Sequence, residues 1–170
     1  MKHQFLLVSF ILCAFIGSGC AVKFNWTGTG TVDDSLETLS VATFINEAPI
    51  VVPYLAQELT EQMQDRFLNQ SRLTLTTGAA DVQLSGSINR YTISPVAISG
   101  NNQADQNRVT LSVRVQFENN VNPDDSWEQS FSGFVDFDAS QDFTSIERET
   151  IDEILEQITQ DVFSKSLGKW

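Results

Sequence analysis

The clearest pattern along the chain is a strict alternation of apolar and polar residues over Val109–Phe117. This alternation predicts a strand with one buried face and one solvated face. A turn over residues 119–125, which includes Pro123, leads to a second alternating segment, Trp127–Phe137. The two strands are expected to pair as an antiparallel hairpin. The second strand has these large residues on one side: Trp127, Phe131, Val135 and Phe137.

The chain before this hairpin predicts a strand followed by an amphipathic helix and a short second strand. Leu36–Ile45 is rich in β-branched and apolar residues, whereas Pro49–Asn69 has apolar residues at helical spacing. Pro53 is expected in the first turn of this helix, where its missing N–H costs nothing. Arg72–Thr77 then predicts the short strand. The apolar side of the helix comprises Val52, Leu55, Leu59, Met63 and Phe67.

A longer strand is predicted over Val82–Ile93, after a turn at residues 78–80. Its apolar residues change parity between Ile88 and Tyr91, which predicts a β-bulge near Asn89–Arg90. Together with the hairpin, this strand gives a mostly antiparallel sheet of four to five strands.

A second amphipathic helix is predicted at the C-terminal end of the chain. Thr144 and Glu147 have the spacing of a capping box, which indicates where the helix begins. The fold class that follows is α+β, a two-layer sandwich with both helices on one face of the sheet. The other face is expected to be polar, with Tyr91 and Phe134 on it, and to meet either solvent or a partner. The apolar stripe of the helix comprises Ile151, Ile154, Leu155, Ile158, Val162 and Phe163.

The N-terminal segment has the pattern of an export signal. A short polar lead precedes an apolar run, Phe5–Ile16, which spans only about 18 Å as a helix and is too short to cross a bilayer. Small residues then lead to Cys20, as in the lipobox of bacterial lipoproteins, although Gly17 stands where that motif usually has an apolar residue. The expected organisation is a signal peptide over residues 1–19, a lipidated tether over 20–34 and one domain over 35–170. The alternative is a secreted protein cut near Gly19, with Cys20 as a free thiol.

The charge of the chain restricts its partners. The net charge is −12, and it becomes about −13 when Lys2 leaves with the signal. Such a chain is not expected to bind nucleic acid. Basic clusters that would hold an anionic membrane are also absent from the sequence, so membrane attachment is assigned to the covalent lipid on Cys20. The second mature residue is Ala21 and not the aspartate that retains lipoproteins in the inner membrane of enterobacteria. This favours sorting to the outer membrane, on its periplasmic side.

The residues left after cleavage exclude the usual catalytic and metal centres. His3 is the sole histidine and is lost with the signal, while Cys20 is used for lipid. Ser-His-Asp and Cys-His systems and zinc sites of the usual type are therefore excluded. Two acidic pairs remain, Asp124–Asp125 and the Asp136/Asp138 pair. They are read as solubilising residues, with acid/base catalysis or calcium binding as the alternative. No cofactor, no metal and no enzymatic activity are expected.

The segment from Tyr91 to Arg108 is predicted to be a loop between two strands, and it mixes apolar residues with Asn and Gln amides. Loops on rigid scaffolds often carry binding residues, so this loop is the candidate binding site for a partner or ligand. Arg90 and Arg108 are its basic candidates, or else they form surface salt bridges. The candidate site residues are Tyr91, Pro95, Ala97, Ile98, Gly100, Asn101, Asn107 and Arg108.

Several segments of the chain, taken together, resemble a known family. The lipobox, the Pro-opened helix, RYTISPVAISGNNQADQNRVTLSVRVQFEN, FSGFVDFDASQDF and a final helix closing with VFSKSLGKW together resemble LptE lipoproteins as they occur in Bacteroidetes. The resemblance implies a non-enzymatic outer-membrane lipoprotein that pairs with an LptD-type β-barrel, plugs its lumen and assists lipopolysaccharide assembly. Enterobacterial relatives use basic residues toward lipopolysaccharide, and this acidic chain departs from them. The alternatives are an auxiliary lipoprotein of another envelope-lipid transporter and a hydrolase that uses carboxylates.

Overall fold

The computed structural model describes residues 35–98 and 104–168. The predicted signal, Cys20 and the tether lie outside the described residues, as do Gly100 and Asn101 of the predicted binding loop. These expectations therefore stay predictions.

The sheet is mixed, with a long antiparallel meander and shorter parallel additions. The strand order is β3-β1-β4-β5-β6, and β2 also pairs with β4. The β4–β5 and β5–β6 pairs are antiparallel, whereas β1 and β2 run parallel to β4, and β3 runs parallel to β1. The strands are β1 Thr38–Val41, β2 Ile45–Asn46, β3 Thr74–Leu75, β4 Val82–Ile98, β5 Ala104–Asn119 and β6 Trp127–Asp138.

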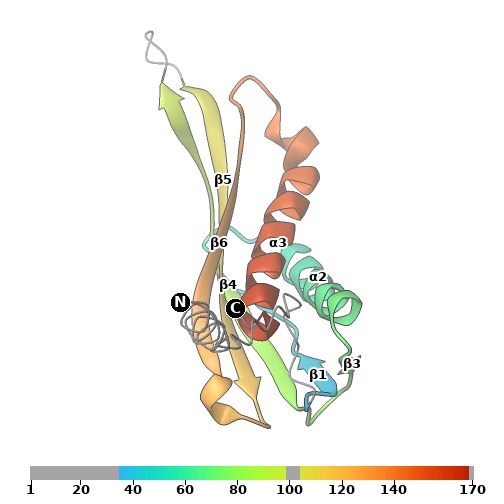
Figure 1. Ribbon diagram of the computed structural model, residues 1–170. Helices are drawn as coiled ribbons and strands as arrows, with labels where there is room; N and C mark the ends of the chain where they lie inside the picture. Colours follow the sequence, from blue (N-terminus) through green and yellow to red (C-terminus); the bar gives the residue numbers. More distant parts are fainter. Residues whose placement is uncertain (1–34, 99–103, 169–170) are drawn as a thin grey trace, which may run out of the picture.

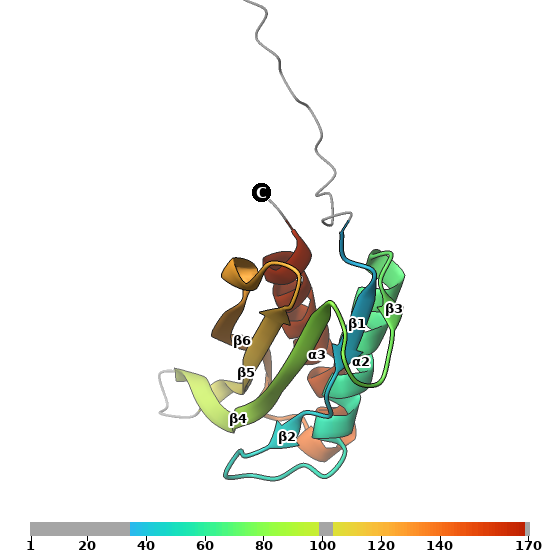
Figure 2. The ribbon, with the colours of Figure 1, turned by 90° about the horizontal axis from the view of Figure 1, so that it is seen from below.

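Two helices, α2 (Leu55–Gln70) and α3 (Phe143–Leu167), cover one face of this sheet (Figures 1 and 2). A short 3₁₀ turn, η2 (Pro123–Asp125), connects β5 to β6. The predicted apolar stripes of both helices face the sheet, with Phe67, Ile154 and Ile158 fully buried among them. The α+β class and the helices on one face are confirmed, and the sheet contains more parallel pairing than the sequence indicated.

The predicted bulge is present, because the β4–β5 register shifts between Ile88 and Arg90. The extra residue turns the side chains beyond it to the opposite face. Tyr91 therefore lies in the core, with 3% of its surface exposed. The expectation that Tyr91 belongs to the polar face is wrong, whereas Phe134 does lie there.

Three local predictions need correction. The segment predicted as a loop is largely a β-hairpin, because β4 continues to Ile98 and β5 begins at Ala104. Asp142, and not Thr144, caps α3, since its carboxylate accepts a hydrogen bond from the Thr144 backbone N–H at 3.2 Å. Pro53 lies before α2, whose N-cap is Tyr54.

Gly86 is the point at which the sheet meets the chain that leads into α2. A Cβ at this position would collide with the backbone oxygen of Arg114 on β5 and would lie 2.8 Å from Cε1 of Phe44, which is buried. The backbone oxygen cannot move without breaking the β4–β5 ladder. Glycine is therefore required here by close packing.

We expect Gly86→Ala to lower the free energy of unfolding by about 1–3 kcal/mol, as overpacking of a core does. Urea unfolding followed by circular dichroism measures the change. Ser85→Ala, one residue earlier and on the solvated face, is the control and should change stability by less than about 0.5 kcal/mol. Equal effects of the two variants would contradict this role of Gly86.

Asp81 fastens the start of β1 to the start of β4. Its Oδ2 accepts hydrogen bonds from the backbone N–H of Glu37 at 3.0 Å and of Thr38 at 2.9 Å, and from the Thr38 hydroxyl at 2.8 Å. In return, the Asp81 backbone N–H donates to Thr38 Oγ1 at 2.9 Å. These bonds, first that from the Thr38 side chain, hold the pKa of the Asp81 carboxyl below its ordinary value.

We expect Asp81→Asn to destabilise the domain at neutral pH. Because the folded pKa is lowered, the carboxylate stabilises the fold above the unfolded pKa of about 3.9, and this contribution is lost as pH falls through the folded pKa. The stability difference between the parent and the variant should therefore shrink with acidification. Urea unfolding of both proteins from about pH 6 to about pH 2 tests this, and a difference independent of pH would refute it.

Candidate partner-binding surface

The sheet face opposite the helices is a continuous polar surface, which we call the outer sheet face. Residues that are directly paired across β4, β5 and β6 share a face, so the registers define its rows. Most of its side chains are hydroxyls, which donate and accept hydrogen bonds. Row by row, the outer sheet face comprises Ser94, Arg108 and Asp136; Thr92, Thr110 and Phe134; Arg90, Ser112 and Ser132; Ser87, Arg114 and Ser130; and Ser85, Gln116 and Glu128.

Arg108, Phe134 and Asp136 form a compact group, the Arg108 cluster, toward the hairpin end of this face. Nε of Arg108 lies 2.6 Å from Oδ1 of Asp136, and one terminal nitrogen lies 2.8 Å from Oδ2, which is a bidentate pair. The same guanidinium lies 3.9 Å from the ring centroid of Phe134. Hydrogen bonding to Arg108 lowers the pKa of Asp136. The cluster is thus held rigid while 49% of the Phe134 surface stays exposed.

The middle of the outer sheet face is a hydrogen-bonding surface. The hydroxyls of Ser112 and Ser132 lie 2.7 Å apart across β5 and β6. Arg114 and Glu128 form a looser ion pair at 3.7 Å, with more than half of each side chain exposed. These groups are exposed hydroxyls and paired charges, so they suit polar contact with another surface.

The predicted site residues do not all come together. Tyr91 is in the core, where its hydroxyl donates to Glu147 Oε1 at 3.3 Å and burial raises its pKa. Pro95 and Asn107 are paired with each other near the hairpin end, and Ala97 and Ile98 are the last positions of β4 before the undescribed residues. Among the predicted site residues that the structure describes, Arg108 lies in the rows of the outer sheet face.

Phe134 and Asp136 are not among the predicted site residues. The signal that would have found them is the alternation itself. Phe134 occurs at a polar-face position of β6, and pairing of that strand with β5 places it opposite Thr110, next to Arg108. An aromatic residue at a wet position of a strand is therefore the informative departure from the pattern.

The two acidic pairs have structural hydrogen bonds. Oδ2 of Asp125 accepts from the Asn122 side chain at 2.7 Å within the η2 turn. Oδ1 of Asp138 accepts from the backbone N–H and the hydroxyl of Ser140, and these bonds lower the pKa of Asp138. Asp136 is paired with Arg108. These contacts favour the structural interpretation of both pairs.

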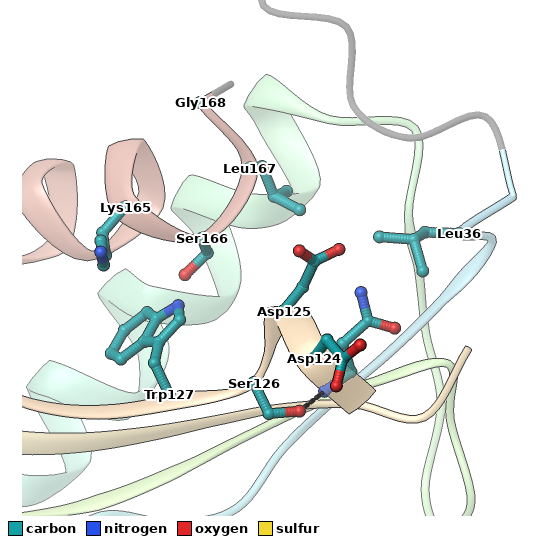
Figure 3. Close-up of a pocket in the computed structure, with 10 residues that line it drawn as sticks. Leu36, Asp124, Asp125, Ser126, Trp127, Lys165, Ser166, Leu167 and Gly168 are labelled. Atoms are coloured by element: carbon teal, nitrogen blue, oxygen red, sulfur yellow. Dashed lines mark hydrogen bonds between the residues drawn. The ribbon is translucent and has the colours of Figure 1, made fainter. Parts of the chain in front are cut away.

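A cavity of about 310 Å³ lies where η2 meets the C-terminal end of α3 (Figure 3). Asp124, Asp125 and Lys165 line it together with Leu36 and Trp127, whose indole N–H has no hydrogen-bond partner among the described residues. Within the part of the chain that the structure describes, no group of three or more His, Cys, Asp or Glu residues is arranged to hold a metal ion. In that same part, neither helix is sufficiently long and apolar to cross a membrane.

Comparison with solved structures shows where this fold occurs. The hypothetical protein CT253 from Chlamydia trachomatis is similar, with a TM-score of 0.58 and 8% identity over 79% of this chain and 97% of that chain. The protein XCC0632 from Xanthomonas campestris has a TM-score of 0.56 and 13% identity, over 81% of this chain and 89% of that chain. At these identities the likeness shows the fold alone. A rare lipoprotein B from Shewanella oneidensis scores 0.44, with 9% identity over 74% of this chain and 89% of that chain.

The sequence itself gives the family. None of the curated proteins compared with this chain matches it. The model of the family described as LptE, lipopolysaccharide-assembly, matches residues 36–166, which span β1 through nearly all of α3. Because this match covers the described domain almost from end to end, the chain belongs to the LptE family, which is linked to lipopolysaccharide assembly.

Proposed function

We propose that this protein is an outer-membrane lipoprotein, anchored by lipid on Cys20, that plugs an LptD-type β-barrel and assists lipopolysaccharide assembly at the cell surface. The family match supports the link to lipopolysaccharide assembly. The barrel partner, the anchor, the outer-membrane location and the Bacteroidetes-like branch rest on the sequence resemblance and belong to the proposal. No catalytic step is part of it.

The observation that carries the plug role is the outer sheet face. The lumen of a large membrane β-barrel is lined by polar residues, so a plug needs an exterior that forms many hydrogen bonds. The rows of hydroxyls on β4, β5 and β6 supply such an exterior, while the two helices pack behind them. This arrangement favours contact through the sheet over contact through the helices.

The positions of the domain's first residues and of the β4–β5 hairpin also suit this role. Leu36, at the start of the described domain, lines the same cavity as Gly168 and Asp125, so the tether would leave from this end. The β4–β5 hairpin extends to the other end (Figure 1), and β4 alone has 17 residues, roughly 50 Å of strand. The membrane-anchored end and the hairpin end are therefore well separated, and the hairpin is placed to reach into a partner.

Direct phosphate recognition is less well supported. Arg108 is already bound by Asp136, and Arg114 is paired with Glu128. The chain also carries a net charge of −12, which repels phosphate groups. In this proposal lipopolysaccharide is contacted chiefly by the barrel, and the lipoprotein supports the barrel.

Photo-crosslinking in intact cells tests which layer meets the partner. A photoreactive residue in place of Thr92 or Ser130, on the outer sheet face, should capture a large β-barrel protein. Gln57 and Glu61, exposed on α2, are the matched controls and should not. Capture from α2 alone would refute contact through the sheet.

Purification of the lipoprotein from solubilised outer membranes without any large β-barrel would refute the plug role and favour an auxiliary role in another envelope-lipid transporter.

The Arg108 cluster gives a second test. We expect Phe134→Ser to reduce recovery of the barrel about tenfold, as loss of an exposed aromatic anchor at an interface does. Its effect on urea unfolding should stay within about 1 kcal/mol, because half of the ring is exposed and its contact with Arg108 is a surface cation–π interaction. Val121→Ser is the control, since Val121 is 48% exposed but lies at the opposite end of the sheet, near η2. Equal recovery with both variants would remove the cluster from the interface.

A further inference from the structure

Strand β6 ends the sheet and is paired on one side only. Each residue of Trp127–Asp138 has a partner in β5, and the sheet has no strand beyond β6 among the described residues (Figure 2). Within that part of the chain, no loop or side chain forms a hydrogen bond with the backbone of Glu128–Phe137 from the outer side. The outward N–H and C=O groups of this segment are therefore an open template for another strand.

The other edges of the sheet have features that prevent such pairing. Strand β3 has only two residues, Thr74 and Leu75. The free part of β4, beyond its pairing with β2, contains Pro95, and its register shifts on both sides of Ala97. Short strands, prolines and bulges are the usual means by which proteins protect an edge. Strand β6 has none of these, and its register with β5 is unbroken.

The charges on the outer side of β6 indicate what would pair with it. They are all acidic, namely Glu128, Asp136 and Asp138. Glu128 and Asp136 lie beside Arg114 and Arg108 of β5, so β6 presents its acidic side chains to a strand with basic ones. Opposite charges that face each other across strands stabilise a sheet, and like charges destabilise it. A strand added next to β6 would face only acidic side chains on this side, so Lys or Arg at alternate positions is favoured.

The inner side of β6 lies directly beneath α3. A Cβ on Gly133 would lie 2.9 Å from Cγ2 of Ile154 and 3.3 Å from the side-chain oxygen of Gln157. Because α3 packs this closely over β6, side chains of an added strand that point inward would lie beside the helix. Apolar or small residues fit this position, alternating with the basic residues on the outer side.

A second copy of this chain does not fit the edge. Pairing β6 with itself about Ser132 places Glu128 opposite Asp136 of the second copy, and pairing about Gly133 places it opposite Asp138. Both registers juxtapose like charges in a chain whose net charge is already −12. Self-association through β6 is therefore opposed by its own side chains.

We propose that the edge of β6 binds an extended segment of a partner protein, which adds to the sheet as a further strand and carries Lys or Arg at alternate positions. Recognition combines main-chain hydrogen bonds, which give affinity, with alternating side chains, which give specificity. A closed β-barrel has no free strand edge to offer, so the occupant is a loop or terminal segment. This interaction uses the edge and not the outer sheet face, and it is independent of the proposed plug role.

Hydrogen exchange on the whole chain, purified in detergent, tests the proposal. The probe is a synthetic peptide of alternating Lys and Val, and a Glu/Val peptide of the same length is its counterpart. The Lys/Val peptide should slow exchange at alternate amides of Glu128–Phe137, whereas the Glu/Val peptide should not. Absence of protection in β6, or protection confined to α2 and α3, would overturn the proposal.

The matched variant is the double charge reversal Glu128→Lys with Asp138→Lys, at two exposed positions. It should bind the Lys/Val peptide about tenfold more weakly and should gain binding of the Glu/Val peptide. The gain shows that the variant is folded. Equal binding of both peptides to the parent chain would rule out selection by charge. Protection of β6 that appears without peptide and rises with protein concentration would identify a second copy as the occupant, and would also overturn the proposal.

Discussion

The pairing of β4 with β5 determines which side chains of this domain are buried and which face outward. It joins Val82 to Asn119 at one end and Ile98 to Ala104 at the other, and the helices and the remaining strands pack around it. A strand has a side-chain period of two, so one extra residue reverses the faces beyond it. The bulge between Ile88 and Arg90 performs that reversal once, and as a result Tyr91 completes the core while Thr92 and Ser94 join the outer sheet face.

The helical layer fixes which surfaces stay available. Gly86 allows Phe44 to close over β4, and Gly133 allows Ile154 of α3 to approach β6. With both helices committed to the same face, the opposite face and the β6 edge have no covering element among the described residues. The polar face is continuous because both helices pack on the other face and no crossover connection of the described chain passes over it.

Alternation was sufficient to predict β5, β6 and the fold class, because a half-buried antiparallel strand repeats its pattern with every second residue. The same reasoning was wrong for Tyr91 and for residues 91–108, where pairing with β5 overrides the local sequence pattern. The bulge near Asn89 was visible in the apolar parity, yet its consequence for Tyr91 depends on the β5 register, which sequence spacing does not give. The hairpin over residues 91–108 looked like a loop because Pro95 and several amides weaken its strand propensity, whereas β5 supplies the hydrogen bonds that keep it extended. Asp142 caps α3 in place of Thr144 because the helix begins at Phe143, and the Asp142 carboxylate accepts the hydrogen bond of the Thr144 N–H.

Several acidic residues of this domain have structural roles. Asp81, Asp125, Asp136 and Asp138 each accept hydrogen bonds that stabilise a strand end, a turn or a cross-strand pair. A carboxylate whose pKa is lowered in this way, as for Asp81, Asp136 and Asp138, is a poor general acid near neutral pH, because it holds no proton to give. These carboxylates stay ionised and lie at the ends and the edge of the sheet, so they also make that part of the surface acidic. On β6 the acidic side chains Glu128, Asp136 and Asp138 all lie on the outer side of the strand, and the proposed recognition of a basic strand depends on them.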